Sequence, residues 1–169
     1  AIDDLAPGEI VIRTAYSSVN YKDALAGTGE GKILRFFPLV GGIDVAGHVV
    51  SSSDPKFKEG DAVLVTGCGL SETRDGGYGE YAVTRANQCV PLPQDLSLAD
   101  GALIEPLAVA LHGINLSGIR TGDKVLVLGA GPIGLAVAFW AKRYGAGRVA
   151  VQDVLAFQQH RAEEMGADV

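Results

Sequence analysis

The chain has 169 residues, 47% hydrophobic and 20% charged, and a net charge of −6, values ordinary for a soluble protein of one large or two small domains. The acidic balance argues against a nucleic-acid partner, and no long apolar run escapes interruption by Gly, Pro or a charge, which argues against a membrane partner. Cys68 and Cys89 show no paired motif and no signal peptide is visible, so we expect reduced thiols in the cytoplasm.

Short extended segments separated by Gly/Pro turns fill residues 1–98. Alternating apolar and polar residues predict four strands and a shorter extended piece, at 9–19, 45–51, 61–66, 79–84 and 88–93. Residues 20–25 break the alternation and predict a short helical turn, and residues 67–77 predict a glycine-rich loop. We therefore expect a small, β-rich, barrel-like domain over residues 1–98.

Residues 99–169 have a different character. Ser97 can cap an Ala/Leu-rich helix over 99–116 that restarts at Pro106. Residues 124–128 are apolar with no polar face, which predicts a strand buried on both sides of a parallel sheet. A glycine turn, a helix over 135–144, a second strand over 148–152 and a last helix over 157–165 follow. This order predicts a linking helix and the first half of an α/β dinucleotide-binding domain.

The glycine turn carries the strongest chemical signal. Gly129 permits a tight turn out of the strand, Gly131 lets a pyrophosphate approach the backbone, and Gly134 lets the helix press against the strand. The N-terminus of the helix favours binding of a phosphate. Asp153 ends the next strand, where its carboxylate can accept hydrogen bonds from the ribose hydroxyls. The alternative is a glycine-rich turn without a ligand. The predicted cofactor-binding residues are Gly129, Gly131, Pro132, Ile133, Gly134 and Asp153.

The chain resembles the medium-chain dehydrogenase/reductase superfamily, whose members join a GroES-like catalytic domain to a Rossmann domain. Residues 9–98 resemble the zinc-free acrylyl-CoA reductase, quinone oxidoreductase-like branch, in segments 16–29, 37–47, 65–70 and 75–78. Residues 103–169 resemble the zinc-type alcohol and polyol dehydrogenase branch, in segments 104–112 and 129–134. The resemblance implies a β-rich GroES-like domain over 1–98, whose first strands we expect to be missing, and a partial Rossmann domain over 99–169. We expect a truncated or chimeric chain; a natural mosaic gives the same pattern.

The resemblance also addresses zinc. Catalytic zinc needs three protein ligands, and at the positions where the zinc branch has Cys and His this chain has Asn20 and Ile43. Glu105 alone matches, so we expect no metal.

A second polar group comes from the reductase-like half, and the resemblance implies that it faces the nicotinamide. Its predicted catalytic residues are Asn20, Tyr21, Asp23 and Asp44. Tyr21 could hydrogen-bond or protonate a carbonyl, and Lys22 could attract an acidic substrate. Alternatively, Asp23 caps its own turn, Lys22 is solvated and Tyr21 is a core residue.

The two halves disagree on the cofactor. The reductase resemblance implies NADPH, whereas the charge of Asp153 would repel a 2′-phosphate and favours NAD. We expect zinc-independent hydride transfer from the reduced form of NAD or NADP to a small activated alkene, an enoyl thioester or an enone. The alternatives are a zinc-type alcohol or polyol dehydrogenase, and a non-catalytic fragment that at most binds nucleotide. The strand over 148–152 would have an unpaired edge that invites homo-oligomers, and we expect little turnover from this chain alone.

Overall fold

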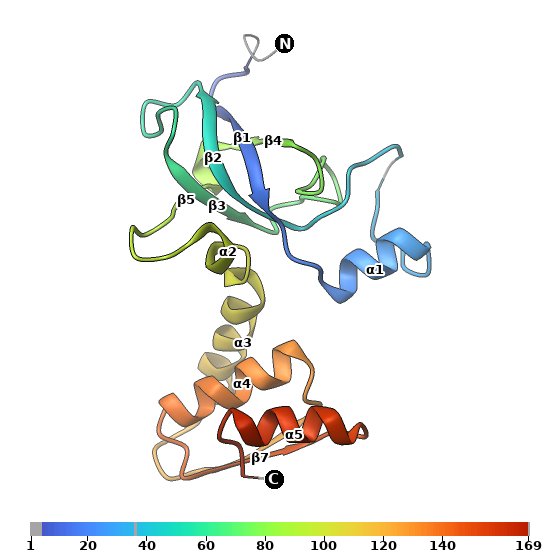
Figure 1. The fold of residues 1–169 in the computed structure, drawn as a ribbon, viewed down its shortest axis with the longest axis vertical. Helices are drawn as coiled ribbons and strands as arrows, with labels where there is room; N and C mark the ends of the chain where they lie inside the picture. The colour runs from blue at the N-terminus through green and yellow to red at the C-terminus, as the bar shows by residue number, and fades with distance from the viewer. Residues whose placement is uncertain (1–4, 36, 169) are drawn as a thin grey trace. The chain divides into compact units, whose positions relative to one another are not determined.

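The computed structural model describes residues 5–35 and 37–168 and divides into two compact units, Ala1–Glu105 and Pro106–Val169 (Figure 1). The predicted domain boundary between residues 98 and 99 remains a prediction. Within the described residues, no helix combines the length and the apolar character that crossing a membrane requires.

The first unit is built on a five-stranded antiparallel sheet in the order β4-β1-β2-β3-β5. Its strands are β1 Glu9–Tyr16, β2 Asp44–Ser52, β3 Ala62–Thr66, β4 Tyr81–Arg85 and β5 Val90–Pro91. Ile12, Val45 and Val63 are almost fully buried and share the main core. Alternate residues of β2 and β3, Ala46 and Leu64, are buried on the opposite face in a second cluster. The register of β1 against β2 shifts twice, between Val11 and Ile12 and between Thr14 and Tyr16. The predicted strands are therefore confirmed, with ends that differ by a few residues.

Helices in the first unit form at its connections. Helix α1, Tyr21–Thr28, follows β1 as predicted, and a 3₁₀ turn, η1, covers Ala86–Gln88. The predicted helix over 99–116 is two helices, α2 Leu98–Gly101 and α3 Ile104–Ser117. Ser97 caps α2 as expected, because its Oγ accepts the N–H of Asp100 at 3.1 Å. Pro106 lies inside the first turn of α3, where a missing N–H leaves no hydrogen bond unmade.

The second unit pairs two parallel strands, β6 Lys124–Leu128 and β7 Arg148–Gln152. Helices α4, Pro132–Arg143, and α5, Ala156–Glu164, complete it. Val127, Val149 and Val151 lie in a core together with alanines of α4 and α5.

The prediction that β6 is buried on both sides is wrong for the described chain. Leu126 is 61% exposed and Leu128 74% exposed. Since alternate residues of a strand point to opposite faces, Val127 is buried while its two neighbours face outward. Continuous apolar sequence indicates two apolar faces, but it does not say what covers each of them.

Candidate functional site

The glycine turn lies between β6 and α4. Gly129 has φ +97°, which only glycine adopts easily, and α4 begins with Pro132 immediately after Gly131. A Cβ atom at Gly134 would lie 1.8 Å from the carbonyl oxygen of Gly129, whereas a Cβ atom at Gly131 would have no heavy-atom neighbour within 4 Å. The turn thus needs glycine at 134 for packing, while the space beside Gly131 is open. Ile133 is 42% exposed.

Asp153 lies beside this turn. Its Oδ2 accepts the N–H of Ala130 at 2.7 Å, and its Oδ1 accepts the N–H of Leu155 at 2.9 Å. These hydrogen bonds, first the one from Ala130, hold the pKa of the carboxyl below its usual value. Each carboxylate oxygen keeps a further lone pair for another donor.

A cavity of about 300 Å³ opens at the carboxyl ends of the two parallel strands, between Leu128, Gly129, Gln152, Asp153 and Val154. Ligands of open α/β sheets bind at such strand ends. The structure therefore brings the predicted cofactor residues to one place, and their role toward a ligand stays a prediction.

The predicted catalytic residues lie together in the first unit, but their polar atoms are engaged with one another. Asp44 is only 1% exposed. Its carboxylate accepts the N–H of Ser18 at 2.6 Å, the Ser18 hydroxyl, and the side-chain amide of Asn20 at 3.1 Å. These contacts fix the chain between β1 and α1, so Asp44 acts first as a structural acceptor.

Residues 21–23 separate into three different environments. Asp23 is 8% exposed, and its Oδ2 accepts the backbone N–H of Asn20 at 2.9 Å, so it caps its own helix as the alternative reading held. Its Oδ1 is buried and has no partner among the described residues. Lys22 forms an ion pair with Glu72, and its side chain remains 42% exposed to solvent. Tyr21 is 80% exposed, which excludes a core role.

Two further residues lie near this cluster: Tyr78, which was not predicted as a site residue, and Glu105, which matched only as a zinc ligand. The Tyr78 ring packs against the backbone of Gly41 and Gly42, and its hydroxyl donates to the carbonyl of Ser18 at 3.0 Å. Burial, followed by the nearby Asp23, raises the pKa of Tyr78 to about 12. Burial and the charge of Asp44 likewise raise the pKa of Glu105. Tyr78 lies in segment 75–78 of the resemblance, but its contact with Ser18 could not be predicted because 60 residues separate the two.

The donor set does not fit catalytic zinc. Ile43 is buried and has no ligating atom, Asn20 is already hydrogen-bonded to Asp44, and Glu105 remains as a single carboxylate. Across residues 5–35 and 37–168, no three His, Cys, Asp or Glu side chains gather closely enough to hold a metal ion.

The two cysteines differ in accessibility. Cys68 is exposed and has φ +52°, in the loop after β3. Cys89 is buried, and this burial raises the pKa of its thiol to about 12.

Known proteins of both branches, reductase and polyol dehydrogenase, are similar to the chain. Over 135 residues the chain is 38% identical to the acrylyl-CoA reductase AcuI of Ruegeria pomeroyi, covering 79% of this chain and 39% of that protein. Over 94 residues it is 45% identical to sorbitol dehydrogenase of Bos taurus, covering 56% of this chain and 26% of that protein. The chain thus spans less than half the length of these relatives.

Solved structures share the fold over nearly the whole chain. The yhdH oxidoreductase of Salmonella enterica, in complex with NADP, superposes with a TM-score of 0.87 at 35% identity, over 98% of this chain and 53% of that one. The Bacillus subtilis protein yhfP, with NAD bound, superposes with a TM-score of 0.83 at 39% identity, over 99% of this chain and 53% of that one. Residues 6–94 match the alcohol dehydrogenase GroES-like domain family. The chain therefore belongs to this family, and with it to the medium-chain dehydrogenase/reductase superfamily.

Proposed function

We propose that the chain is part of an NAD(P)-dependent oxidoreductase that reduces an activated alkene without zinc. The observation that carries the proposal is the turn at the start of α4, which is open beside Gly131 and bordered by the Asp153 carboxylate. A dinucleotide pyrophosphate would lie against Gly131 and the N-terminus of α4, since free N–H groups and the helix dipole favour phosphate there. When bound, the nicotinamide supplies a hydride.

Asp153 would select among the two dinucleotides. Its lowered pKa keeps it ionised at neutral pH, and its remaining lone pairs suit the two hydroxyls of an adenosine ribose. A 2′-phosphate at that place would meet a carboxylate, so NAD is favoured over NADP. Both cofactors should be tested, because one of the similar solved structures contains NADP and the other contains NAD.

The alkene substrate is inferred from the first unit and from the likeness to an acrylyl-CoA reductase. With Ile43 in place of a zinc ligand, the substrate carbonyl must be polarised by hydrogen bonds. Tyr78 is suited to this, because a pKa of about 12 keeps its hydroxyl protonated and 47% of the residue is exposed. It would exchange its hydrogen bond to the Ser18 carbonyl for one to the developing enolate oxygen, and the α-carbon would then take its proton from solvent water.

Binding of nucleotide without turnover is the second candidate. It is favoured by the engagement of Asp44, Asn20 and Lys22 in contacts within the fold. A zinc-type alcohol dehydrogenase is disfavoured by Ile43.

Calorimetric titration with NADH and NADPH tests the cofactor site. NADH should bind about tenfold more tightly than NADPH, the effect of roughly one unfavourable charge contact. Gly131→Ala should weaken the binding of NADH by about tenfold or more, since the added methyl group occupies the space through which the pyrophosphate reaches the backbone. Gly113→Ala is the matched control, because a Cβ atom there also meets nothing within 4 Å and no ligand is expected. Failure of both dinucleotides to bind would contradict the proposal.

Steady-state assays then separate the candidates. Consumption of NADH with an enone or enoyl thioester supports alkene reduction, and Tyr78→Phe should lower kcat by about tenfold while Tyr81→Phe does not. Alcohol oxidation supports the zinc-type alternative. Binding without consumption of either substrate class supports the second candidate.

A further inference from the structure

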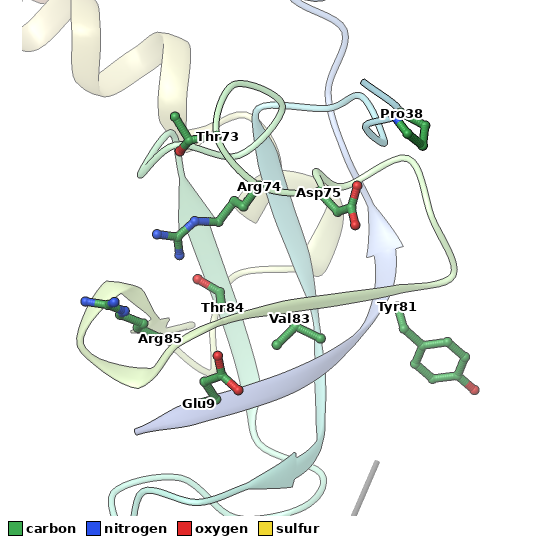
Figure 2. Close-up of a pocket in the computed structure, with 9 residues that line it drawn as sticks. All are labelled: Glu9, Pro38, Thr73, Arg74, Asp75, Tyr81, Val83, Thr84 and Arg85. Atoms are coloured by element: carbon green, nitrogen blue, oxygen red, sulfur yellow. The ribbon is translucent and has the colours of Figure 1, made fainter. Parts of the chain in front are cut away.

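A second cavity lies in the first unit, over β4 (Figure 2). It has a volume of about 480 Å³, within the range of small-molecule sites. None of its residues belongs to the Asp44 cluster or to the glycine turn. Its lining is polar and partly aromatic: Glu9, Pro38, Thr73, Arg74, Asp75, Tyr81, Val83, Thr84 and Arg85.

Arg74 is held in a fixed position in this lining. Its guanidinium donates to Gln88 Oε1 at 2.7 Å, and the buried Thr84 hydroxyl donates to the same oxygen at 3.1 Å. Gln88 thus orients the arginine without neutralising it, and no ion pair to Arg74 occurs among residues 5–35 and 37–168. A half-buried guanidinium with free N–H groups favours an anion beside it.

Strand β4 contributes to the cavity from both of its faces, because the buried Thr84 points the opposite way from its two neighbours, toward Gln88. Tyr81, Val83 and Arg85 alternate along this strand and share a face. Tyr81 is 51% exposed and Val83 48% exposed. Figure 2 shows the guanidinium groups of Arg74 and Arg85 at one end of the lining and the Tyr81 ring at the other. The four residue steps from 81 to 85 span about 13 Å.

Two carboxylates also line the cavity, and both already accept backbone N–H groups. Glu9 Oε2 accepts the N–H of Ala6 at 2.9 Å, and Asp75 Oδ1 accepts the N–H of Val40 at 2.8 Å. Glu9 is paired with Arg85 in the β1–β4 register. Its charge would oppose an anion at that end, so removing it should strengthen anion binding.

We propose that this cavity binds a phosphate monoester that carries a flat ring. The phosphate lies between Arg74 and Arg85, whose planar forks match its oxygens, with the Thr73 hydroxyl nearby. The ring lies along Val83 and Tyr81, two to four residue steps along β4 from Arg85. This site is separate from the proposed dinucleotide site and does not depend on it.

The test titrates phenyl phosphate into the whole chain. Binding is monitored by NMR, through the resonances of the backbone N–H groups and of the arginine side-chain N–H groups. Saturable shifts are expected at Arg74, Arg85 and Val83, which the phenyl ring of this short probe can reach. Inorganic phosphate should bind at the same arginines about tenfold more weakly, because it lacks the ring. Arg74→Gln should weaken the binding of phenyl phosphate by about tenfold or more, since a charge-assisted hydrogen bond is lost. Arg74→Lys should weaken this binding by less, because the charge is kept.

Glu9→Gln should have the opposite effect and strengthen the binding of phenyl phosphate several-fold, because it removes a negative charge beside the phosphate. Lys124→Gln, a loss of the same charge in the second unit, should leave it unchanged. Unchanged NADH binding in Arg74→Gln, and unchanged phenyl phosphate binding in Gly131→Ala, keep the two sites distinguishable. An unchanged urea transition by circular dichroism shows that the first unit of Arg74→Gln still folds. The proposal is overturned if phenyl phosphate causes no saturable shift, if Arg74→Gln binds it like the parent chain, or if Gly131→Ala abolishes its binding.

Discussion

The polar cluster around Asp44 and the glycine turn beside Asp153 use polar atoms in opposite ways. In the cluster, the carboxylate of Asp44 is buried and receives three donors from the fold itself. At the turn, Asp153 is only partly buried and keeps acceptor capacity, while the space beside Gly131 stays open. The difference teaches that residue type alone does not identify a site. What distinguishes one is hydrogen-bonding capacity that the fold leaves unused.

The largest expected effect comes from removing the centre of the cluster. Asp44→Ala should lower the free energy of unfolding of the first unit by about 3–5 kcal/mol, because buried donors of Ser18 and Asn20 lose their acceptor at about 1–3 kcal/mol each. Urea denaturation followed by circular dichroism measures this. Fluorescence of the only tryptophan, Trp140, reports on the second unit and should keep its midpoint.

Asp95→Ala, at an exposed position, is the control and should change stability by less than about 0.5 kcal/mol. If Asp44→Ala were equally mild, Asp44 would not be the structural acceptor described above, and its carboxylate would be available for chemistry.

The turn should respond differently at its two glycines. Gly134→Ala should destabilise the second unit by about 1–3 kcal/mol, because its methyl group meets the Gly129 carbonyl and the helix must shift. Gly131→Ala should leave stability nearly unchanged and affect only dinucleotide binding. Unfolding followed by Trp140 fluorescence compares the two variants. Equal destabilisation by both would remove the distinction between packing and binding glycines.

A smaller effect of opposite sign is expected at Glu105. Its raised pKa means that the folded state disfavours the charged form, a penalty absent below about pH 4 that develops as pH rises through the folded pKa. Glu105→Gln should therefore stabilise the protein at pH 7, by at most about 0.5 kcal/mol because the group is largely solvated. Thermal melts at pH 3.5 and pH 7 check this, and a variant less stable at pH 7 would contradict it.

The smallest expected effect is the contribution of Asp153 to stability, which is lost at acidic pH. Its lowered pKa contributes stability above the unfolded value of about 4, and this contribution is lost as pH falls through the lower folded pKa. Asp153→Asn should melt slightly below the parent chain at pH 7, and the two curves should converge under more acidic conditions. A gap that widens on acidification would show that the Ala130 hydrogen bond does not favour the ionised form.

Local signals made most of the fold predictable. Alternation along 9–19 and 45–51, the Ser97 cap and the glycine turn each act within a few residues, so the sequence displays them directly. The capping role of Asp23 was also within reach as an alternative, since its acceptor lies three residues from the N–H of Asn20.

Contacts between distant segments could not be read in the same way. Lys22 meets Glu72 across 50 residues, and Tyr78 meets Ser18 across 60. Such pairs leave no periodic trace in one sequence, because each partner is compatible with many others until the sheet brings the segments together. The resemblance pointed to segments 16–29 and 37–47, but it could not show that the carboxylates of Asp23 and Asp44 are held by the fold.

The contrast between the two cysteines has a practical consequence for labelling. The Cys89 thiol is shielded and stays protonated at neutral pH, whereas Cys68 is exposed. A maleimide dye should therefore attach once per chain, at Cys68, without any cysteine being replaced. That dye would sit six residues before Arg74, on the loop that carries this arginine into the cavity, and would give a fluorescent signal for ligand entry there.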